Sequence, residues 1–368
     1  MNNCNKLLSI CIPVYNQKDL VRICVEHILQ CNSQKFEIVL NDDCSTENIE
    51  SLLEYFSDNR VKYFRNTTNL GHDRNIIAAF MNASANYCFL LRSRDYIIPD
   101  GLYNVLDFLS NNTCAYLTTS AFDSNNVPKL VYKDWTYEKG AEALKAHNTL
   151  YVHPSGSIYN KSLLNLQQLD NFLCELKISK YNFTVHTLMR MQLACKGNFV
   201  TLKNYSWVYA DTENSKDVAM NSGSHKKSVY DTEYELERYK TVILWCDKIL
   251  EEPYRTNQFL NTFSVFLYAS TWNNKLIYGS KQLQKHYNFE YRRVNCRTER
   301  KKFVDYSILL EKKIEIIDKN YKTKKRRIIL KNQTIEGIKY YYLYMRSHFP
   351  FKFTIKKIIF SAMPFLRR

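Results

Sequence analysis

Glycine and proline are scarce in this chain of 368 residues, which contains only 8 Gly and 7 Pro. That scarcity excludes the collagen-like and low-complexity classes of protein. Hydrophobic residues make up 45% of the sequence, and Tyr (28) and Phe (20) are abundant. We therefore expect a folded globular protein, long enough for one large domain or for two.

The sequence also lacks closely spaced cysteines and long apolar runs. None of its 11 cysteines forms a Cys-x-x-Cys pair, which argues against zinc ribbons and disulfide scaffolds and favours a reduced, cytoplasmic setting. Residues 1–7 lack the apolar core of a signal peptide. No uninterrupted apolar run reaches the roughly 18 residues of a membrane-spanning helix, so none is expected.

Acidic residues are few in the last third of the chain. Residues 231–368 hold 29 Lys and Arg against 14 Asp and Glu, whereas residues 1–230 hold 23 against 22. Such an asymmetry usually separates a working domain from a region that touches something anionic. We therefore expect one domain over residues 1–230 and a basic, aromatic-rich, mainly helical region over residues 231–368.

Short apolar segments alternate with segments of helical spacing in the first third of the chain. The pattern predicts strands at 7–16, 36–40, 61–64 and 88–91, helices at 19–30, 49–56 and 76–85, and further on a strand at 114–120 and a helix at 135–147. Repeated strand–helix alternation indicates a doubly wound α/β fold with a parallel sheet.

Polar residues cluster where each predicted strand ends. The clusters are Tyr15 and Asn16, Asp42 and Asp43, Arg74 and Asn75, and Arg92 to Asp95. In a doubly wound sheet these loops lie along one edge, where ligands bind. Arg92 and Arg94 would project to the same side of an extended backbone. Two adjacent guanidiniums suit a diphosphate, although a solvated turn with two arginines is an alternative interpretation.

Four motifs in order carry a family resemblance. They span Ser9–Asn16, Glu37–Glu47, Asn69–Asn75 and Asp95–Asp100. Together they resemble family 2 glycosyltransferases of the GT-A fold, over roughly residues 7–110. The resemblance implies a Rossmann-like, mostly parallel central sheet with helices on both faces. It also implies a nucleotide-sugar donor, usually UDP-linked, and inversion at the anomeric carbon.

The resemblance implies where the donor binds. Residues 1–110 would form the nucleotide-sugar-binding half of the domain and residues 111–230 the acceptor half. The expected donor-binding residues are Pro13, Tyr15 and Asn16 around the nucleoside, Asp42 and Asp43 near the base, Arg74 toward the nucleoside or phosphates, and Arg92, Arg94 and Asp95 near the diphosphate.

The sequence departs from the family where a metal would bind. The family usually has Asp-x-Asp-Asp, with a carboxylate holding Mn²⁺ or Mg²⁺, but this chain has Arg92-Ser93-Arg94-Asp95. Such ions prefer carboxylate oxygens to guanidiniums. Arginines can neutralise a leaving diphosphate directly. We therefore predict a metal-independent enzyme, with Asp95 as the one candidate metal ligand and a candidate catalytic residue. A degenerate, inactive copy is the alternative.

An inverting transfer needs a general base for the acceptor hydroxyl. The family usually supplies an Asp on the helix before a Lys-Gly turn, which here is residues 196–197. Counting back from that turn reaches His186, and residues 178–202 contain no acid. Imidazole works as a base near neutral pH, so His186 is the candidate. Glu175 and Asp170 are fallbacks, and a helix-face histidine without a catalytic part is the alternative.

Three further segments complete the expected site. Gly156 lies where the family places the floor of the acceptor site and would allow close approach of a sugar, or it is an ordinary turn glycine. Residues 211–226 are expected to form a lid over the donor. Residues 355–362 have the spacing of a basic amphipathic helix, which can lie on an anionic bilayer. Packing of these helices on the catalytic domain is the alternative.

The preferred interpretation is a bacterial glycosyltransferase of surface polysaccharide or glycoconjugate biosynthesis. It would transfer a sugar to a glycan or lipid-linked acceptor and would be peripheral at the cytoplasmic face of the cell membrane. A catalytically inactive scaffold with the same fold is the second interpretation. A nucleic-acid-binding protein is the third, but the basic region shows no recognisable DNA- or RNA-binding module, so no nucleic acid is expected as a partner.

Overall fold

The computed structural model describes residues 6–150, 152–177, 184–210, 232–255, 257–259 and 261–262. All of them lie in the first of two units, Met1–Tyr306 and Ser307–Arg368. The expected lid at 211–226 and the expected amphipathic helix at 355–362 lie outside the described residues, and the predicted boundary at residue 230 stays a prediction. Within the described ranges, no helix has the length and apolar character needed to cross a membrane.

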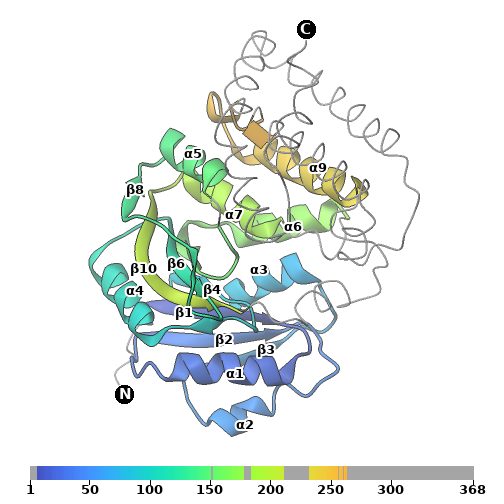
Figure 1. Ribbon diagram of the computed structural model, residues 1–368. Helices are drawn as coiled ribbons and strands as arrows, with labels where there is room; N and C mark the ends of the chain where they lie inside the picture. Colours follow the sequence, from blue (N-terminus) through green and yellow to red (C-terminus); the bar gives the residue numbers. More distant parts are fainter. Residues whose placement is uncertain are drawn as a thin grey trace, which may run out of the picture. The chain divides into compact units, whose positions relative to one another are not determined.

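The strands of the described region form one mixed sheet (Figure 1). They are β1 (Leu8–Val14), β2 (Phe36–Asp42), β3 (Val61–Arg65), β4 (Tyr87–Leu90), β5 (Tyr96–Ile97), β6 (Tyr116–Asp123), β7 (Pro128–Leu130), β8 (Trp135–Tyr137), β9 (Ser157–Asn160) and β10 (Phe199–Tyr209). The order is β3-β2-β1-β4-β9-β6-β10-β5, with β7 beside β6 and β8 beside β10.

The parallel, doubly wound part that the sequence predicts is confirmed for β1 to β4. These strands pair in parallel, with Ile10 opposite both Ile38 and Phe89. Every residue of β2 and β4 is buried, as expected of parallel strands covered on both faces. Beyond β4 the sheet is mixed, because β9 runs antiparallel to both β4 and β6, while β6 and β10 run parallel.

Helices cover both faces of this sheet. They are α1 (Lys18–Leu29), α2 (Leu52–Phe56), α3 (His72–Asn82), α4 (Pro99–Asn111), α5 (Ala141–Thr149), α6 (Leu166–Glu175), α7 (Val185–Ala194) and α9 (Thr232–Ile249), with a 3₁₀ turn at Lys161–Leu163. Val25 of α1 and Leu106 of α4 join the core cluster of Ile10 and Leu40 on one face. Successive strand residues point to opposite faces, and on the other face the Cys11 thiol lies 3.8 Å from the carbonyl oxygen of Ala79 in α3.

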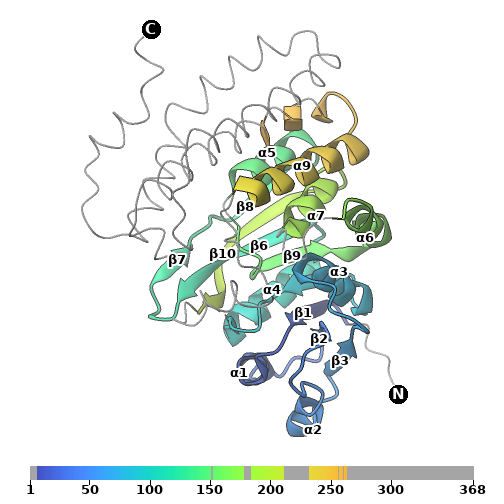
Figure 2. The same cartoon turned by 90° about the vertical axis from the view of Figure 1, so that its right-hand side faces the viewer.

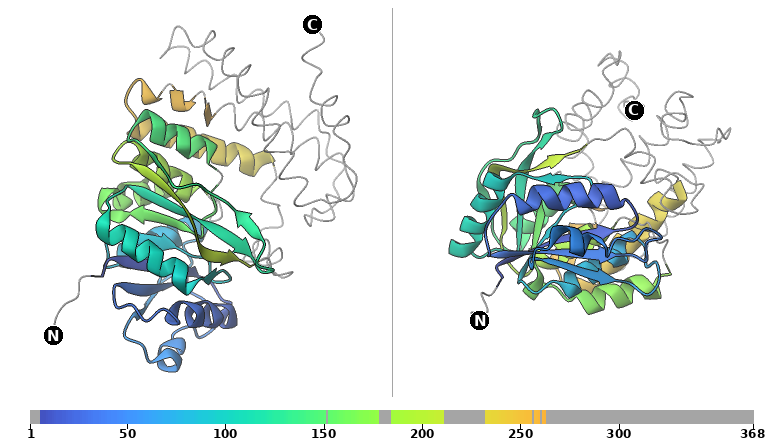
Figure 3. Two further views of the ribbon diagram at one scale, coloured as in Figure 1. Left: turned by 60° about the vertical axis from the view of Figure 1, so that its left-hand side comes forward. Right: turned by 90° about the horizontal axis from the view of Figure 1, so that it is seen from below.

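Further helices extend the face that α3 covers. Figure 2 shows α3, α6, α7 and α9 in succession on that side, and the view from below in Figure 3 places α1 and the green helices on opposite sides of the blue strands. Trp245 of α9 is fully buried, lies 4.8 Å from the Phe172 ring, and donates its indole N–H to the Leu188 carbonyl at 3.0 Å. The first described helix after residue 230 therefore packs on α6 and α7.

Two predicted elements differ from the structure. Residues 135–137 form the edge strand β8, paired with β10, rather than the start of a helix, which begins only at Ala141. Helix α3 begins at His72 rather than at residue 76, directly after Gly71, whose φ of 84° lets the chain turn. Arg74 therefore lies in the first turn of a helix and not in a loop.

Gly101 allows α4 to lie directly on β10. A Cβ atom at this position would lie 2.2 Å from the carbonyl oxygen of Tyr205 and 2.4 Å from Cα of Ser206. Replacing Gly by Ala inside a helix normally stabilises it by roughly 0.5–1 kcal/mol. Here we predict that Gly101→Ala lowers the free energy of unfolding by about 1–3 kcal/mol, because overpacking forces the backbones apart.

Urea unfolding followed by circular dichroism measures this change. Asn104→Ala is the matched control, because Asn104 is an exposed residue of the same helix. We expect the control to stay near the wild-type value. Equal stability of the two variants would contradict the close contact between α4 and β10.

Candidate functional site

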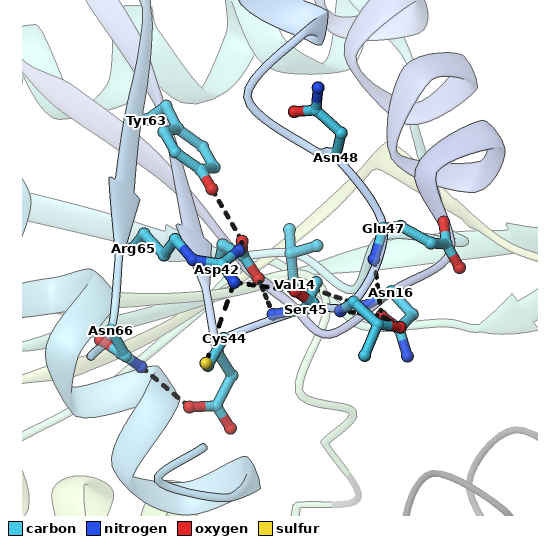
Figure 4. Close-up of polar contacts among 12 residues, drawn as sticks. Val14, Asn16, Asp42, Cys44, Ser45, Glu47, Asn48, Tyr63, Arg65 and Asn66 are labelled. Atoms are coloured by element: carbon cyan, nitrogen blue, oxygen red, sulfur yellow. Dashed lines mark hydrogen bonds and ion pairs between the residues drawn. The ribbon is translucent and has the colours of Figure 1, made fainter. Parts of the chain in front are cut away.

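The loops that follow β1 and β2 are joined by hydrogen bonds around Asn16. Its backbone N–H donates to the Ser45 hydroxyl at 2.7 Å, and its Oδ1 accepts from the Thr46 backbone N–H at 2.9 Å. Glu47 then accepts the backbone N–H groups of Gln17 and Lys18 at 3.0 and 2.7 Å, at the start of α1. Figure 4 shows Asn16 facing this loop. The half-buried Pro13 and Tyr15 lie at the same strand end.

Asp42 is fully buried and bonded within the protein. Figure 4 shows Tyr63 and Arg65, both from β3, pointing toward it. Its oxygens accept the Ser45 backbone N–H at 2.8 Å, the Tyr63 hydroxyl at 2.7 Å, and the Arg65 guanidinium. Burial and the hydrogen bond to Asp42 raise the pKa of Tyr63 to about 12. Sequence reasoning missed Tyr63 and Arg65, although their spacing of two in a strand places both on one face.

Asp43 holds the start of α3. It accepts the Asn66 side-chain amide at 2.9 Å and the backbone N–H groups of Leu70 and Gly71 at 2.7 and 2.9 Å. The predicted base-binding carboxylate therefore also shapes the loop between β3 and α3. Asn66 was not singled out from the sequence, because its spacing gives no signal for this contact.

Arg74 is paired with a carboxylate from a distant helix. Its Nε and Nη2 donate to the two oxygens of Asp170 in α6 at 2.7 and 3.0 Å. This bidentate pair joins α3 to α6 and engages one of the two fallback bases. The other fallback, Glu175, is exposed and lies 3.8 Å from Lys248, so the structure does not bring it to the other predicted site residues.

The segment after β4 is a turn rather than a continued strand. β4 ends at Leu90, and the Asp95 backbone N–H donates to the Arg92 carbonyl at 3.0 Å. The extended backbone on which we based parallel projection of Arg92 and Arg94 is therefore absent at these positions. Instead, Nε and Nη2 of Arg92 donate to the two oxygens of Asp95 at 2.7 and 2.8 Å.

Asp95 receives two more hydrogen bonds. The Ser155 hydroxyl donates to Oδ2, and the Ala210 backbone N–H donates to Oδ1 at 3.2 Å. The residue is 0% exposed. A carboxylate has about four acceptor positions, and in Asp95 all of them are taken by Arg92, Ser155 and Ala210. This buried group ties the end of β4 to the loop before β9 and to the residue after β10.

The residues at the end of β4 do not fit a divalent cation. Mn²⁺ and Mg²⁺ bind through free carboxylate and other oxygen atoms, and Asp95, the predicted metal candidate, offers none. Its neighbours in the motif are two guanidiniums and a hydroxyl. In the part of the chain that the structure describes, no group of three His, Cys, Asp or Glu side chains could hold a metal ion.

Positive charge gathers around His153. The guanidinium of Arg92 lies 4.9 Å from the centre of the Tyr209 ring, and the His153 imidazole stacks 5.2 Å from Trp207. Burial, followed by the charges of Arg92, His186 and Arg94, holds the pKa of His153 well below its ordinary value. Its Nδ1 accepts the Ser155 N–H at 3.1 Å, so the neutral ring carries its proton on Nε2. Sequence reasoning gave His153 no role.

Gly156 makes room for a tryptophan rather than for a sugar. A Cβ atom there would lie 2.0 Å from Nε1 of the fully buried Trp207. The φ of 82° also favours glycine. The prediction that this missing side chain admits the acceptor is therefore corrected, because the indole ring fills that space.

His186 lies in the first turn of α7, beside a second histidine. Its ring centroid is 6.1 Å from that of His72, at 87°. The residue is half-buried, and its Nδ1 is shielded from solvent without a hydrogen-bond partner in the described residues. Burial and the charge of His72 lower the pKa of His186 to about 4, although Asp73 opposes the shift. His186 is therefore neutral at neutral pH and able to accept a proton.

Comparison with known proteins finds similarity to glycosyltransferases. Residues 9–166 match the family model described as Glycosyl transferase family 2. The chain is 33% identical over 118 residues to the abequosyltransferase RfbV of Salmonella typhimurium, covering 30% of this chain and 35% of that protein. It is 28% identical over 155 residues to the putative teichuronic acid biosynthesis glycosyltransferase TuaG of Bacillus subtilis, covering 39% and 60%. The chain thus spans less than two thirds of each of these relatives.

Solved structures show a shared fold. The crystal structure of S. aureus TarS 1-349 in complex with UDP-GlcNAc superposes with a TM-score of 0.52 at 18% identity, covering 81% of this chain and 92% of that one. The complex of the same protein with UDP gives a TM-score of 0.52 at 17% identity, covering 86% and 92%.

Removal of the Asp95 charge tests the role assigned to this carboxylate. Asp95→Asn leaves the Arg92 guanidinium without its counter-charge beside a buried polar cluster. Breaking a buried pair costs 3–5 kcal/mol, and we predict a loss of about 3 kcal/mol because Arg92 keeps partial exposure. Asp134→Asn is the matched control, since its ion pair with Lys203 is exposed. Equal loss in both variants, measured by urea unfolding, would refute the assignment.

Three histidines that are wholly or partly buried predict loss of stability in acid. Burial lowers the pKa of His147, His153 and His186, so between about pH 4 and pH 6.5 the unfolded chain binds more protons than the folded chain. The free energy of unfolding therefore falls as the pH falls through this window, by up to about 1.4 kcal/mol per pH unit for each group.

His147→Gln removes one of these groups. We predict that the dependence of unfolding free energy on pH becomes less steep in this variant between pH 6.5 and 4, measured by urea unfolding at several pH values. A slope identical to that of the wild type would contradict the buried, neutral state of His147.

Proposed function

From the match of residues 9–166 to glycosyl transferase family 2, we propose that the protein transfers a sugar from a nucleotide-sugar donor to a glycan or lipid-linked acceptor in surface polysaccharide biosynthesis. The named functions of RfbV and TuaG support this class of reaction. UDP is the donor nucleotide that we propose, and the TarS complexes, which hold UDP and UDP-GlcNAc, make it the first to test.

One observation carries the proposal: a positively charged turn follows β4, beside β1 in the sheet. The β1 and β2 loops meet through Asn16, and β1 lies between β2 and β4. Ligands of α/β sheets bind at the carboxyl ends of the strands. A donor with its nucleoside near β1 and β2 would thus extend its diphosphate toward Arg92 and Arg94.

We propose that the diphosphate leaves without help from a metal ion. Arg92 uses Nε and one Nη2 hydrogen on Asp95 and also interacts with Tyr209. A guanidinium has five N–H donors, and we propose that the remaining N–H groups bind the diphosphate. Arg94 follows two residues later and adds a second positive charge. Fixed charges aimed at a developing diphosphate stabilise the transition state as an ion would.

The proposed reaction is a single displacement with inversion. The acceptor oxygen attacks the anomeric carbon, the bond from that carbon to the diphosphate oxygen breaks with its electron pair, and the hydroxyl proton moves to a base. His186 is the proposed base because it is neutral at neutral pH and because it and Arg94 both lie close enough to His153 to affect the pKa of that histidine. We also propose that the basic C-terminal region brings the enzyme to the inner face of the cell membrane, where lipid-linked acceptors lie.

A screen of nucleotide sugars tests the function and its metal requirement together. We predict that the protein releases the nucleoside diphosphate from a UDP-sugar, with water or a glycan as acceptor, at the same rate in excess EDTA as in Mn²⁺. Activity lost in EDTA and restored by Mn²⁺ would contradict metal independence. Donor binding without turnover of any nucleotide sugar would contradict the transferase and favour a glycan-binding scaffold.

Arg94→Met tests whether Arg94 supplies the positive charge that we propose in place of a metal ion. The substitution removes the charge and keeps most of the side-chain length. We predict a fall in kcat of about 100-fold, the size seen when one preorganised donor to a developing negative charge is lost. Lys203→Met, on the exposed part of β10, is the matched control and should keep the wild-type rate. Equal rates in the two variants would exclude Arg94 from the diphosphate site.

A further inference from the structure

The helices α3 and α7 begin beside each other, and one buried carboxylate holds both starts. Asp73 is the second residue of α3 and is 3% exposed. Its Oδ2 accepts the backbone N–H groups of Thr184 and Val185 at 2.8 and 3.3 Å and the Thr184 hydroxyl at 3.2 Å. Free N–H groups at a helix start carry partial positive charge. The ionised form of Asp73 is therefore stabilised at the start of α7.

The other oxygen of the same carboxylate holds a histidine. Oδ1 of Asp73 lies 2.8 Å from Nδ1 of His72. An ionised carboxylate only accepts hydrogen bonds, so Nδ1 of His72 carries the proton in this contact. Burial acts to raise the pKa of Asp73, but the hydrogen bond from His72 and the charges of His72 and His186 outweigh it, and the pKa is lowered. The carboxylate thus stays ionised at neutral pH.

His186 follows directly on the residues that this carboxylate holds. Val185 immediately precedes it, and the rings of His186 and His72 lie nearly perpendicular at a centroid distance of 6.1 Å. The position of the His186 backbone and one side of its ring are therefore both set through Asp73. Neither His72 nor Asp73 received a role from the sequence, where they lie inside the Asn69–Asn75 motif.

We propose that Asp73 and His72 are positioning residues for His186, the base of the sugar transfer: Asp73 fixes the start of α7 and the ring of His72, and it balances the charge that His186 gains when it takes the acceptor proton. The inference rests on the proposed function. His186 would return the proton to solvent after the diphosphate has left.

The charges that face His186 come from several elements. His72 and Asp73 lie on α3, Arg190 lies one turn further along α7, and His153 lies in the loop before β9. The positive charges of His72 and Arg190 lower the pKa of His186, and the negative charge of Asp73 raises it. Removal of His72 and removal of the Asp73 charge should therefore move the pKa of His186 in opposite directions.

Two substitutions separate positioning from simple packing. His72→Gln removes the charge but keeps a polar side chain. Asp73→Asn removes the carboxylate charge but keeps an oxygen that can accept the helix N–H groups. Nuclear magnetic resonance titration of the histidine Cε1–H signals in the full chain follows each ring, and His186→Gln identifies the signal of His186 among the 8 histidines.

We expect His72→Gln to raise the pKa of His186 and Asp73→Asn to lower it, each by about one unit. The acidic limb of the pH profile of kcat/KM for donor turnover should move in the same directions, because the base acts only when it is unprotonated. The control Asp134→Asn should move neither. Shifts in the same direction, or an unchanged His186 signal in both variants, would overturn the inference.

The titration needs no donor, so the two proposals fail separately. If the His186 pKa shifts in opposite directions in the two variants but the protein turns over no nucleotide sugar, the proposed function is wrong. The arrangement of His72, Asp73 and His186 would still be supported. If the protein turns over a nucleotide sugar but neither substitution changes the pH profile, the transferase proposal stands. The positioning role of Asp73 and His72 would then be refuted. If Asp73→Asn does not fold, the His72→Gln variant alone tests the proposal. An unchanged His186 pKa in that variant would contradict it.

Discussion

The carboxylate of Asp95 is the group on which the geometry of this site depends. It is fully buried and accepts hydrogen bonds from Arg92, Ser155 and the Ala210 backbone. A buried carboxylate is costly unless such partners compensate it, and here they come from the end of β4, the loop before β9 and the end of β10. The same contacts fix Arg92 against Tyr209. The carboxylate predicted from the sequence as a candidate metal ligand therefore holds parts of the protein together instead.

The other carboxylates of this edge are used in the same way. Asp42 is bonded to side chains of β3, Asp43 to the loop before α3, and Asp73 to the start of α7. Their negative charge is balanced within the fold. These acids are thus engaged within the protein, while the turn after β4 carries two arginines. The internal pairing of these acids is therefore compatible with the anionic donor that we propose.

Local sequence patterns predicted most of the parallel half of the sheet, because apolar runs and turn residues determine strands such as β1 and β2. They also predicted polar residues directly after β1, β2 and β4, and the carboxyl ends of these parallel strands share one edge. They failed where a contact joins distant segments: the earlier start of α3 depends on Asp43, and the packing against Gly156 depends on Trp207. Spacing within a segment carries no information about such partners. For the same reason, the pairing of Arg74 with Asp170 could not be predicted.

A crystal structure of the protein with UDP, grown in Mn²⁺, tests the central claim most directly. The anomalous signal of manganese would locate any bound ion. Our account predicts a diphosphate held by Arg94 and Arg92, with Asp95 still bonded to Ser155 and no manganese peak beside the phosphates. A manganese ion between Asp95 and the diphosphate, with Arg92 displaced from that carboxylate, would contradict it.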